Sequence, residues 1–168
     1  MEESEESEES EESEEELEES EEELEEEPKE PKEPKEPMEL KDPSREILVI
    51  NTGATSTKVA WYSSKNCVFL DILRHGDEAL GRYEMVAEQR GFRTECVREA
   101  VEGWGRRLGE LGAVSARGGL LPSLAGGTYR VNEAMCAFLE AAPRGEHASN
   151  LGALIAWELA EEARQEGE

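Results

Sequence analysis

Cysteine, positive charge and long apolar runs are all scarce in this sequence of 168 residues. The cysteines have no Cys-x-x-Cys spacing, which argues against a disulfide framework and against a zinc site. We therefore expect reduced thiols at Cys67, Cys96 and Cys136. No apolar run approaches the roughly 20 residues that span a bilayer, and no basic segment with a following apolar stretch marks the amino terminus. The sequence predicts a soluble cytoplasmic protein with no membrane partner.

Negative charge is distributed very unevenly. Residues 1–40 contain 23 Glu and three Lys, a net charge of −20 within a total of −24. Glu-Glu-Ser repeats occupy residues 2–13, and Pro-Lys-Glu repeats occupy residues 28–36. Such a segment buries too little apolar area to offset its ordering entropy, and its like charges repel. We expect a disordered acidic tail and linker over residues 1–45 and a folded body over residues 46–168.

Two roles for the acidic tail stay open. Multivalent Coulomb attraction would dock it on a cationic partner, such as a ribosomal or histone-like surface. Alternatively, the tail is a solubilising extension produced by repeat expansion, since a charge run alone has little specificity. Its carboxylates would repel phosphates, so we expect no nucleic-acid binding by this segment.

Short apolar segments separated by polar turns open the body, at residues 47–50, 58–62 and 67–73. Their composition and spacing predict an antiparallel meander of strands. A further apolar run at residues 113–116 ends in glycines. We expect a fourth strand there, with a functional loop at its end.

The rest of the body has a helical composition. Residues 78–111 predict two helices, interrupted around Gly91 and Phe92 and again near Gly103 and Gly105. The glycines are the basis for both interruptions, because glycine weakens a helix interior.

Two further helices are predicted over residues 131–141 and 149–165. Ser149 is a plausible N-cap of the second, which has an apolar face. With the helical regions before and after the fourth predicted strand each counted once, the resulting order of elements, β-β-β-α-β-α, is that of a ribonuclease H-like half-unit.

The turn between the first two predicted strands combines glycine, hydroxyl groups and an amine. Glycine permits close approach, backbone N–H groups can form an anion-binding concavity, and lysine can neutralise charge on a transferred phosphoryl group. The candidate phosphate-binding residues are Asn51, Thr52, Gly53, Ser56, Thr57 and Lys58. The alternative is an ordinary hairpin rich in turn-forming residues. The spacing is not that of a Walker A loop.

Arg117 stands at the end of the fourth predicted strand, followed by Gly118 and Gly119. Its guanidinium could hold a carboxylate or phosphate bidentately, or it could be an ordinary exposed arginine in a flexible loop. His147 precedes a predicted helix and is either a structural capping group or a catalytic one. His75, after the third predicted strand, is a weaker candidate, either a substrate-side residue or part of a surface turn.

Four segments occur in order along the body: ILVINTGATSTKVA (47–60), ARGGLL (116–121), GGTYRVNEAM (126–135) and GEHASNLG (145–152). Together they resemble butyrate kinase and its branched-chain relatives in the acetate kinase family. The resemblance implies an α/β fold, the ribonuclease H-like half of an actin/hexokinase-type ATPase. It also implies phosphoryl transfer between ATP, with Mg²⁺, and butyrate or another short-chain carboxylate, giving an acyl phosphate.

The resemblance assigns Arg117 to the carboxylate or the transferred phosphoryl group, and makes His147 a candidate donor to transition-state charge. Further residues fall on the substrate side, namely Gly118, Gly119, Asn132, Glu133 and Asn150. No protein ligand for a metal is identified. Residues 115–116 and 122–123 depart from the usual family pattern, so we expect a differently shaped loop around Arg117.

The family continues past the matched region to another strand and to a complete second domain, which forms the other wall of the nucleotide site. We therefore expect an incomplete fold with an unpaired sheet edge and little or no kinase activity alone. A separate chain could supply the second domain. The alternatives are a non-catalytic fragment, an interaction protein that acts through its acidic tail, or an inert gene remnant.

Overall fold

The computed structural model describes residues 46–167, which form an α/β fold. The elements are β1 (Glu46–Thr52), β2 (Ser56–Ser63), β3 (Asn66–Arg74), α2 (Asp77–Leu80), the 3₁₀ helix η1 (Val86–Gln89), α3 (Arg90–Gly103), the 3₁₀ helix η2 (Leu108–Glu110), β4 (Leu111–Ala116), α4 (Glu133–Ala141) and α5 (Asn150–Glu166). The predicted strands are confirmed, each slightly longer than expected. The predicted tail, residues 1–45, lies outside the described residues. None of the described helices has both the length and the apolar character of a membrane span.

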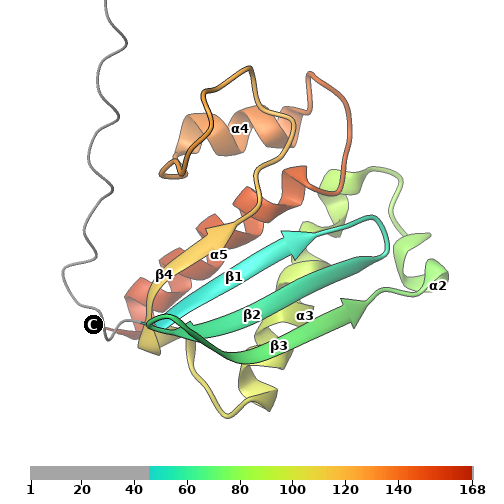
Figure 1. Cartoon of the computed structure of the whole chain (residues 1–168). Coiled ribbons are helices and arrows are strands. Elements are labelled where there is room, and N and C mark those ends of the chain that lie inside the picture. Colours follow the sequence, from blue (N-terminus) through green and yellow to red (C-terminus); the bar gives the residue numbers. More distant parts are fainter. Residues whose placement is uncertain (1–45, 168) are drawn as a thin grey trace, which may run out of the picture. The chain divides into compact units, whose positions relative to one another are not determined.

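The strands form one mixed sheet in the order β3-β2-β1-β4 (Figure 1). The first three make the predicted antiparallel meander, with Thr52 opposite Thr57 at the turn between β1 and β2. β4 runs parallel to β1, with Ala116 opposite Ile50. The carboxyl end of β4 therefore lies beside that turn, so both predicted functional loops reach the same end of the sheet.

One face of the sheet carries the core. Leu48 and Ile50 of β1 and Val59 and Trp61 of β2 are buried on this face, as expected from strand alternation. α3 and α5 both lie behind the strands in Figure 1 and cover this face. α5 contributes apolar side chains that include Leu151, Leu154, Ile155 and Leu159. Full burial of each such side chain stabilises the fold by roughly 1.5–3 kcal/mol.

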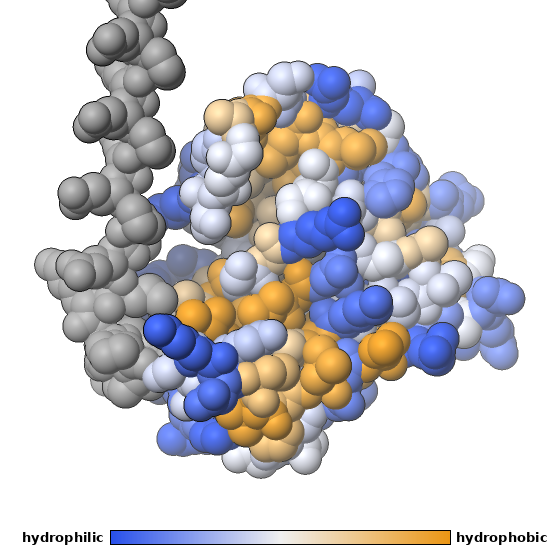
Figure 2. Space-filling model, viewed as in Figure 1, coloured by the Kyte–Doolittle hydropathy of each residue, from blue (hydrophilic) through white to orange (hydrophobic). Residues whose placement is uncertain are grey.

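The opposite face of the sheet points toward the viewer in Figure 1, and none of the described helices covers it. On β3 this face presents Val68, Leu70 and Ile72, all exposed, with Leu70 reaching 66%. Figure 2 shows apolar surface over the strands in the same view. The fold thus has one packed face and one apolar face open to solvent.

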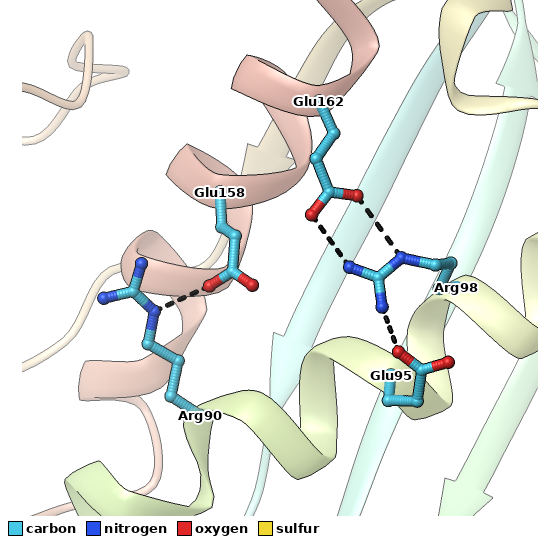
Figure 3. Close-up of polar contacts among 5 residues, drawn as sticks. All are labelled: Arg90, Glu95, Arg98, Glu158 and Glu162. Carbon is cyan, nitrogen blue, oxygen red and sulfur yellow. Dashed lines mark hydrogen bonds and ion pairs between the residues drawn. The ribbon is translucent and has the colours of Figure 1, made fainter. Parts of the chain in front are cut away.

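Ion pairs join α3 to α5 (Figure 3). Arg90 Nε donates to Glu158 at 2.8 Å, and Arg98 donates to Glu162 at 2.8 Å and also to Glu95. The hydrogen bond that Arg98 donates to Glu162 is the main cause of a raised pKa at Arg98. All these groups are partly exposed, and such pairs contribute roughly 0–1 kcal/mol each. They fix the alignment of the two helices more than they stabilise them.

The prediction of a helix break around Gly91 and Phe92 was wrong. α3 runs without interruption from Arg90 to Gly103, and the break falls earlier, over residues 81–85 between α2 and η1. A helical glycine costs only about 1 kcal/mol relative to alanine, which the buried face of α3 offsets. The second predicted interruption is confirmed, because Gly105 adopts a positive φ of 72° just after the helix.

Candidate phosphate-binding site

The turn between β1 and β2 is closed by its own backbone. Gly53 N–H donates to the Ser56 carbonyl at 2.8 Å, and strand pairing begins immediately below the turn. Ala54 and Thr55, at the tip, are exposed. The predicted phosphate loop is therefore a short, hydrogen-bonded turn with a solvent-facing tip.

Arg93 of α3 supports this turn and is fully buried. Its Nη1 donates to the Gly53 carbonyl and its Nη2 to the Ala54 carbonyl, both at 2.8 Å. Gln89 Oε1 accepts from Arg93 Nε at 3.1 Å and orients the guanidinium. Arg93 could not be predicted as part of the site, because arginine is rarely buried and the carbonyls that it binds lie far away in the sequence.

Thr57 and His75 extend the same network. Thr57 Oγ1 accepts from Arg93 Nη1 at 3.3 Å, which leaves its hydroxyl proton for His75 Nε2, 2.9 Å away. The backbone N–H of His75 donates to the Thr55 carbonyl at 2.9 Å. Burial, together with repulsion from Arg93, lowers the pKa of His75. A residue that was only a weak candidate in the sequence thus supports the turn as a buried, neutral imidazole.

Because folding lowers the pKa of His75 below its ordinary 6.5, stability should fall as the pH drops below that value. Below pH 6.5 the imidazole of the unfolded chain binds a proton more readily than the native imidazole does, so protonation favours unfolding. The slope for one group is at most about 1.4 kcal/mol per pH unit. Urea unfolding at pH 7.5 and pH 5.5 should show a smaller pH dependence in His75→Gln than in the wild type. Identical dependences in the two proteins would contradict this assignment.

Lys58, Asn51 and Arg117 form a row across the loop end of the sheet. Lys58 lies opposite Asn51 in the β1–β2 pairing, and Arg117 N–H donates to the Ile50 carbonyl at 3.0 Å, continuing the pairing of β4. Strand alternation places the three side chains on the face away from the helices. Both cations are exposed, and Asn51 is half-buried between them. This row brings residues from two separate predicted motifs onto one surface.

Asn150 ties the loop after Arg117 to the turn before α5. Its Oδ1 accepts from Leu120 N–H at 2.9 Å, and its Nδ2 donates to the Gly145 carbonyl at 3.1 Å. A Cβ at Gly119 would lie 2.7 Å from Asn150 Cα, so only glycine allows this approach. Asn150 is buried and both ends of its amide are bonded. The structure therefore places Asn150 and Gly119 in the packing between the two loops.

Gly152 brings the first turn of α5 against the end of β4. A Cβ there would lie 2.8 Å from the Arg117 carbonyl and 3.5 Å from Thr52 Oγ1. Thr52 is buried, and its hydroxyl has no hydrogen-bond partner among the described residues. This close approach, with no side chain between, sets where Arg117 leaves the sheet. Gly118, by contrast, has open space around it.

His147 lies in the turn before α5 and is exposed. Its Nδ1 accepts from the Ser149 backbone N–H at 3.1 Å and lies 2.7 Å from Ser149 Oγ. Nδ1 therefore acts as the acceptor in this turn, which leaves Nε2 as the nitrogen that can donate. Ser149 occupies the predicted N-cap position of α5, but its side chain makes no capping hydrogen bond. Its hydroxyl instead orients His147 as an Nε2–H donor.

Asn132 and Glu133 lie at the start of α4. The helix begins at Glu133, whereas the sequence predicts a start at residue 131. Asn132 Oδ1 accepts from Met135 N–H at 2.9 Å and caps the helix, while Glu133 occupies the first turn. An acidic side chain there is favourable beside the helix dipole. α4 packs on α5, which begins with the Asn150 junction. The structure thus gives both residues a role at the start of α4.

A groove of about 600 Å³ lies between β3 and α3, away from the row of cations. His75, Phe92, Cys96 and Trp104 are among its lining residues. Burial raises the pKa of the Cys96 thiol. His75 connects the groove to the candidate site, because it lines the groove and also supports the turn between β1 and β2.

No protein-family model matches this chain.

Proposed function

We propose that this chain supplies one side of a butyrate kinase-type active site, which transfers a phosphoryl group between ATP and butyrate or a branched short-chain carboxylate. The observation that carries the proposal is the hydrogen-bonded turn at residues 53–56 beside the row of Lys58, Asn51 and Arg117. Both parts come from sequence segments that resemble the family. Their meeting at one end of the sheet supports a shared role.

Phosphoryl transfer requires cations and hydrogen-bond donors near the negatively charged reacting groups, and the turn and the row supply both. A carboxylate oxygen forms a bond to the γ-phosphorus as the bond to the bridging oxygen breaks, and that electron pair stays on ADP. Lys58 and the turn amides offset charge on the transferred oxygens. Arg117 binds the carboxylate through paired N–H donors, and His147 Nε2–H is a further donor. Positioning and charge are enough, so no side-chain nucleophile is needed.

The topology is compatible with this proposal. β4 lies parallel to β1 beside an antiparallel meander, and this arrangement supports the proposal of a ribonuclease H-like half. In an actin/hexokinase-type arrangement, two such halves close on the nucleotide. Residues 46–167 would then provide one wall, and a second domain, on this or a separate chain, would provide the other.

Mg²⁺, which the family resemblance implies, does not fit the residues of this wall. Across residues 46–167, no three His, Cys, Asp or Glu side chains gather in a group that could hold a metal ion. The charged side chains in the row are the cations Lys58 and Arg117, whereas Mg²⁺ prefers carboxylate and phosphate oxygens. We therefore assign none of these residues as a metal ligand in the proposed phosphoryl transfer.

Two substitutions test the proposed roles in the full chain. Lys58→Met should weaken ATP binding, and Arg117→Met should weaken butyrate binding, each by about tenfold for the loss of a charged hydrogen bond. Isothermal titration calorimetry with ATP and with butyrate measures both effects.

Lys65→Met is the matched control, because Lys65 is exposed in the turn at the opposite end of β2. It should bind both compounds as the wild type does. Equal weakening in Lys65→Met would indicate a general charge effect, and absence of ATP binding by the wild type would refute the proposal.

A further inference from the structure

All four carbonyl groups of the turn are held by donors within the protein. Arg93 binds those of Gly53 and Ala54, and the His75 backbone N–H binds that of Thr55. The Ser56 carbonyl accepts from Gly53 N–H, with Arg93 Nη1 a longer 3.4 Å away. The carbonyl side of the turn is thus fixed toward the protein interior.

The direction of these carbonyls also fixes the direction of the amides. In a trans peptide unit the C=O of one residue and the N–H of the next point in opposite directions, and the described residues contain no cis peptide bond. With the Gly53 and Ala54 carbonyls turned to Arg93, the N–H groups of Ala54 and Thr55 point away from it. Both residues are exposed, so these N–H groups lie on the solvent side, where an anion can reach them.

Arg93 also contributes charge. Its hydrogen-bond partners among the described residues are main-chain carbonyls, the Gln89 amide oxygen and the Thr57 hydroxyl, and none is a carboxylate. Burial lowers the pKa of Arg93 from the ordinary arginine value, but a guanidinium stays charged at neutral pH. A buried cation without an anionic partner produces a positive potential at the turn above it, which attracts an anion there.

We propose that Arg93 is the positioning residue of the phosphate-binding turn: it holds the carbonyls inward, aims the Ala54 and Thr55 amides at a bound phosphoryl group, and adds positive potential from below. The inference rests on the proposed function, since it concerns the same turn. Arg93 itself, being fully buried, touches no ligand and acts through the main chain.

Inorganic phosphate and ATP are the probes, titrated into the full chain while the ¹H–¹⁵N shifts of Ala54 and Thr55 are followed. Arg93→Met should weaken binding by roughly tenfold or more, because two charged hydrogen bonds that shape the turn are lost. Arg93→Lys keeps the charge but cannot bind both carbonyls with one planar fork, and should bind with intermediate affinity. Arg98→Met, on the same helix and paired to Glu162, should bind as the wild type.

A purely structural role would lower the unfolding midpoint of Arg93 variants yet leave the phosphate affinity of the folded protein unchanged. That result, with wild-type binding intact, overturns the inference and leaves the proposed function standing. Absence of any shift in the wild type overturns both. If Arg93→Met does not fold, phosphate affinity is measured instead in Gln89→Leu and Arg93→Lys. Gln89→Leu removes the acceptor that orients the guanidinium. Unweakened binding in both variants then refutes the role of Arg93.

Discussion

Replacing Trp61 by alanine is expected to lower the free energy of unfolding by about 3–5 kcal/mol, as is typical for a large aromatic side chain removed from a core. Trp61 is fully buried on the helix-covered face of β2. Its indole N–H donates to the Glu46 carboxylate, and the Arg106 guanidinium lies 5.6 Å from its ring centroid. The substitution leaves a cavity and removes one donor to the Glu46 carboxylate, which still accepts from Ser63 Oγ at 2.7 Å. Urea denaturation followed by circular dichroism measures the loss.

Trp104→Ala is the control for this substitution. Trp104 stacks on Phe69 with ring centroids 5.2 Å apart, at the edge of the core, and is only partly buried. Removing the Trp104 side chain should lower the free energy of unfolding by clearly less than removing that of Trp61, because less buried apolar area is lost. Equal losses in the two variants would show that burial in the sheet does not set the stability of the fold.

Gly152→Ala is expected to destabilise the protein by about 1–3 kcal/mol, the usual cost of overpacking. Alanine inside a helix is ordinarily more stable than glycine by about 1 kcal/mol, so the sign of the change is informative. Here the new methyl group would lie 2.8 Å from the Arg117 carbonyl, which belongs to the main chain and cannot rotate away. Either α5 or the end of β4 must shift, and thermal unfolding should register the cost.

Gly91→Ala provides the opposite result within the same chain. Gly91 lies in α3, where an added Cβ would meet open space, so alanine there should raise stability by up to about 1 kcal/mol. Opposite signs for the two substitutions would support the close contact at Gly152. A stabilised Gly152→Ala variant would contradict it.

The sheet could be predicted from the sequence because its signals are local. Apolar runs such as 47–50 and 67–73 are bounded by turn-forming residues, and each became a strand. The helix boundaries were harder to predict. Local propensity predicts a helix break at Gly91, yet α3 continues because Val97 and Val101 are buried against the core. Packing of this kind is invisible to a local pattern.

The candidate site was predictable only in its exposed parts. Lys58 and Arg117 stood out as cations in glycine-containing loops, and the structure sets them in one row. Arg93 and the bonded state of His75 could not be predicted, since their partners are main-chain carbonyls and a hydroxyl remote in the chain. Ser149 was placed correctly at the start of α5, but its hydroxyl hydrogen-bonds to the His147 imidazole instead of capping the helix.

The bonds of Arg93 to Gly53 and Ala54 have a consequence for protein engineering. Because the guanidinium recognises main-chain carbonyls, it is indifferent to which side chains stand at the tip of the turn. Positions 54 and 55 are exposed and can be diversified in a library while the backbone keeps its shape. Ligand preference at this turn should therefore be adjustable independently of its architecture, which makes the pair of positions a natural starting point for directed evolution.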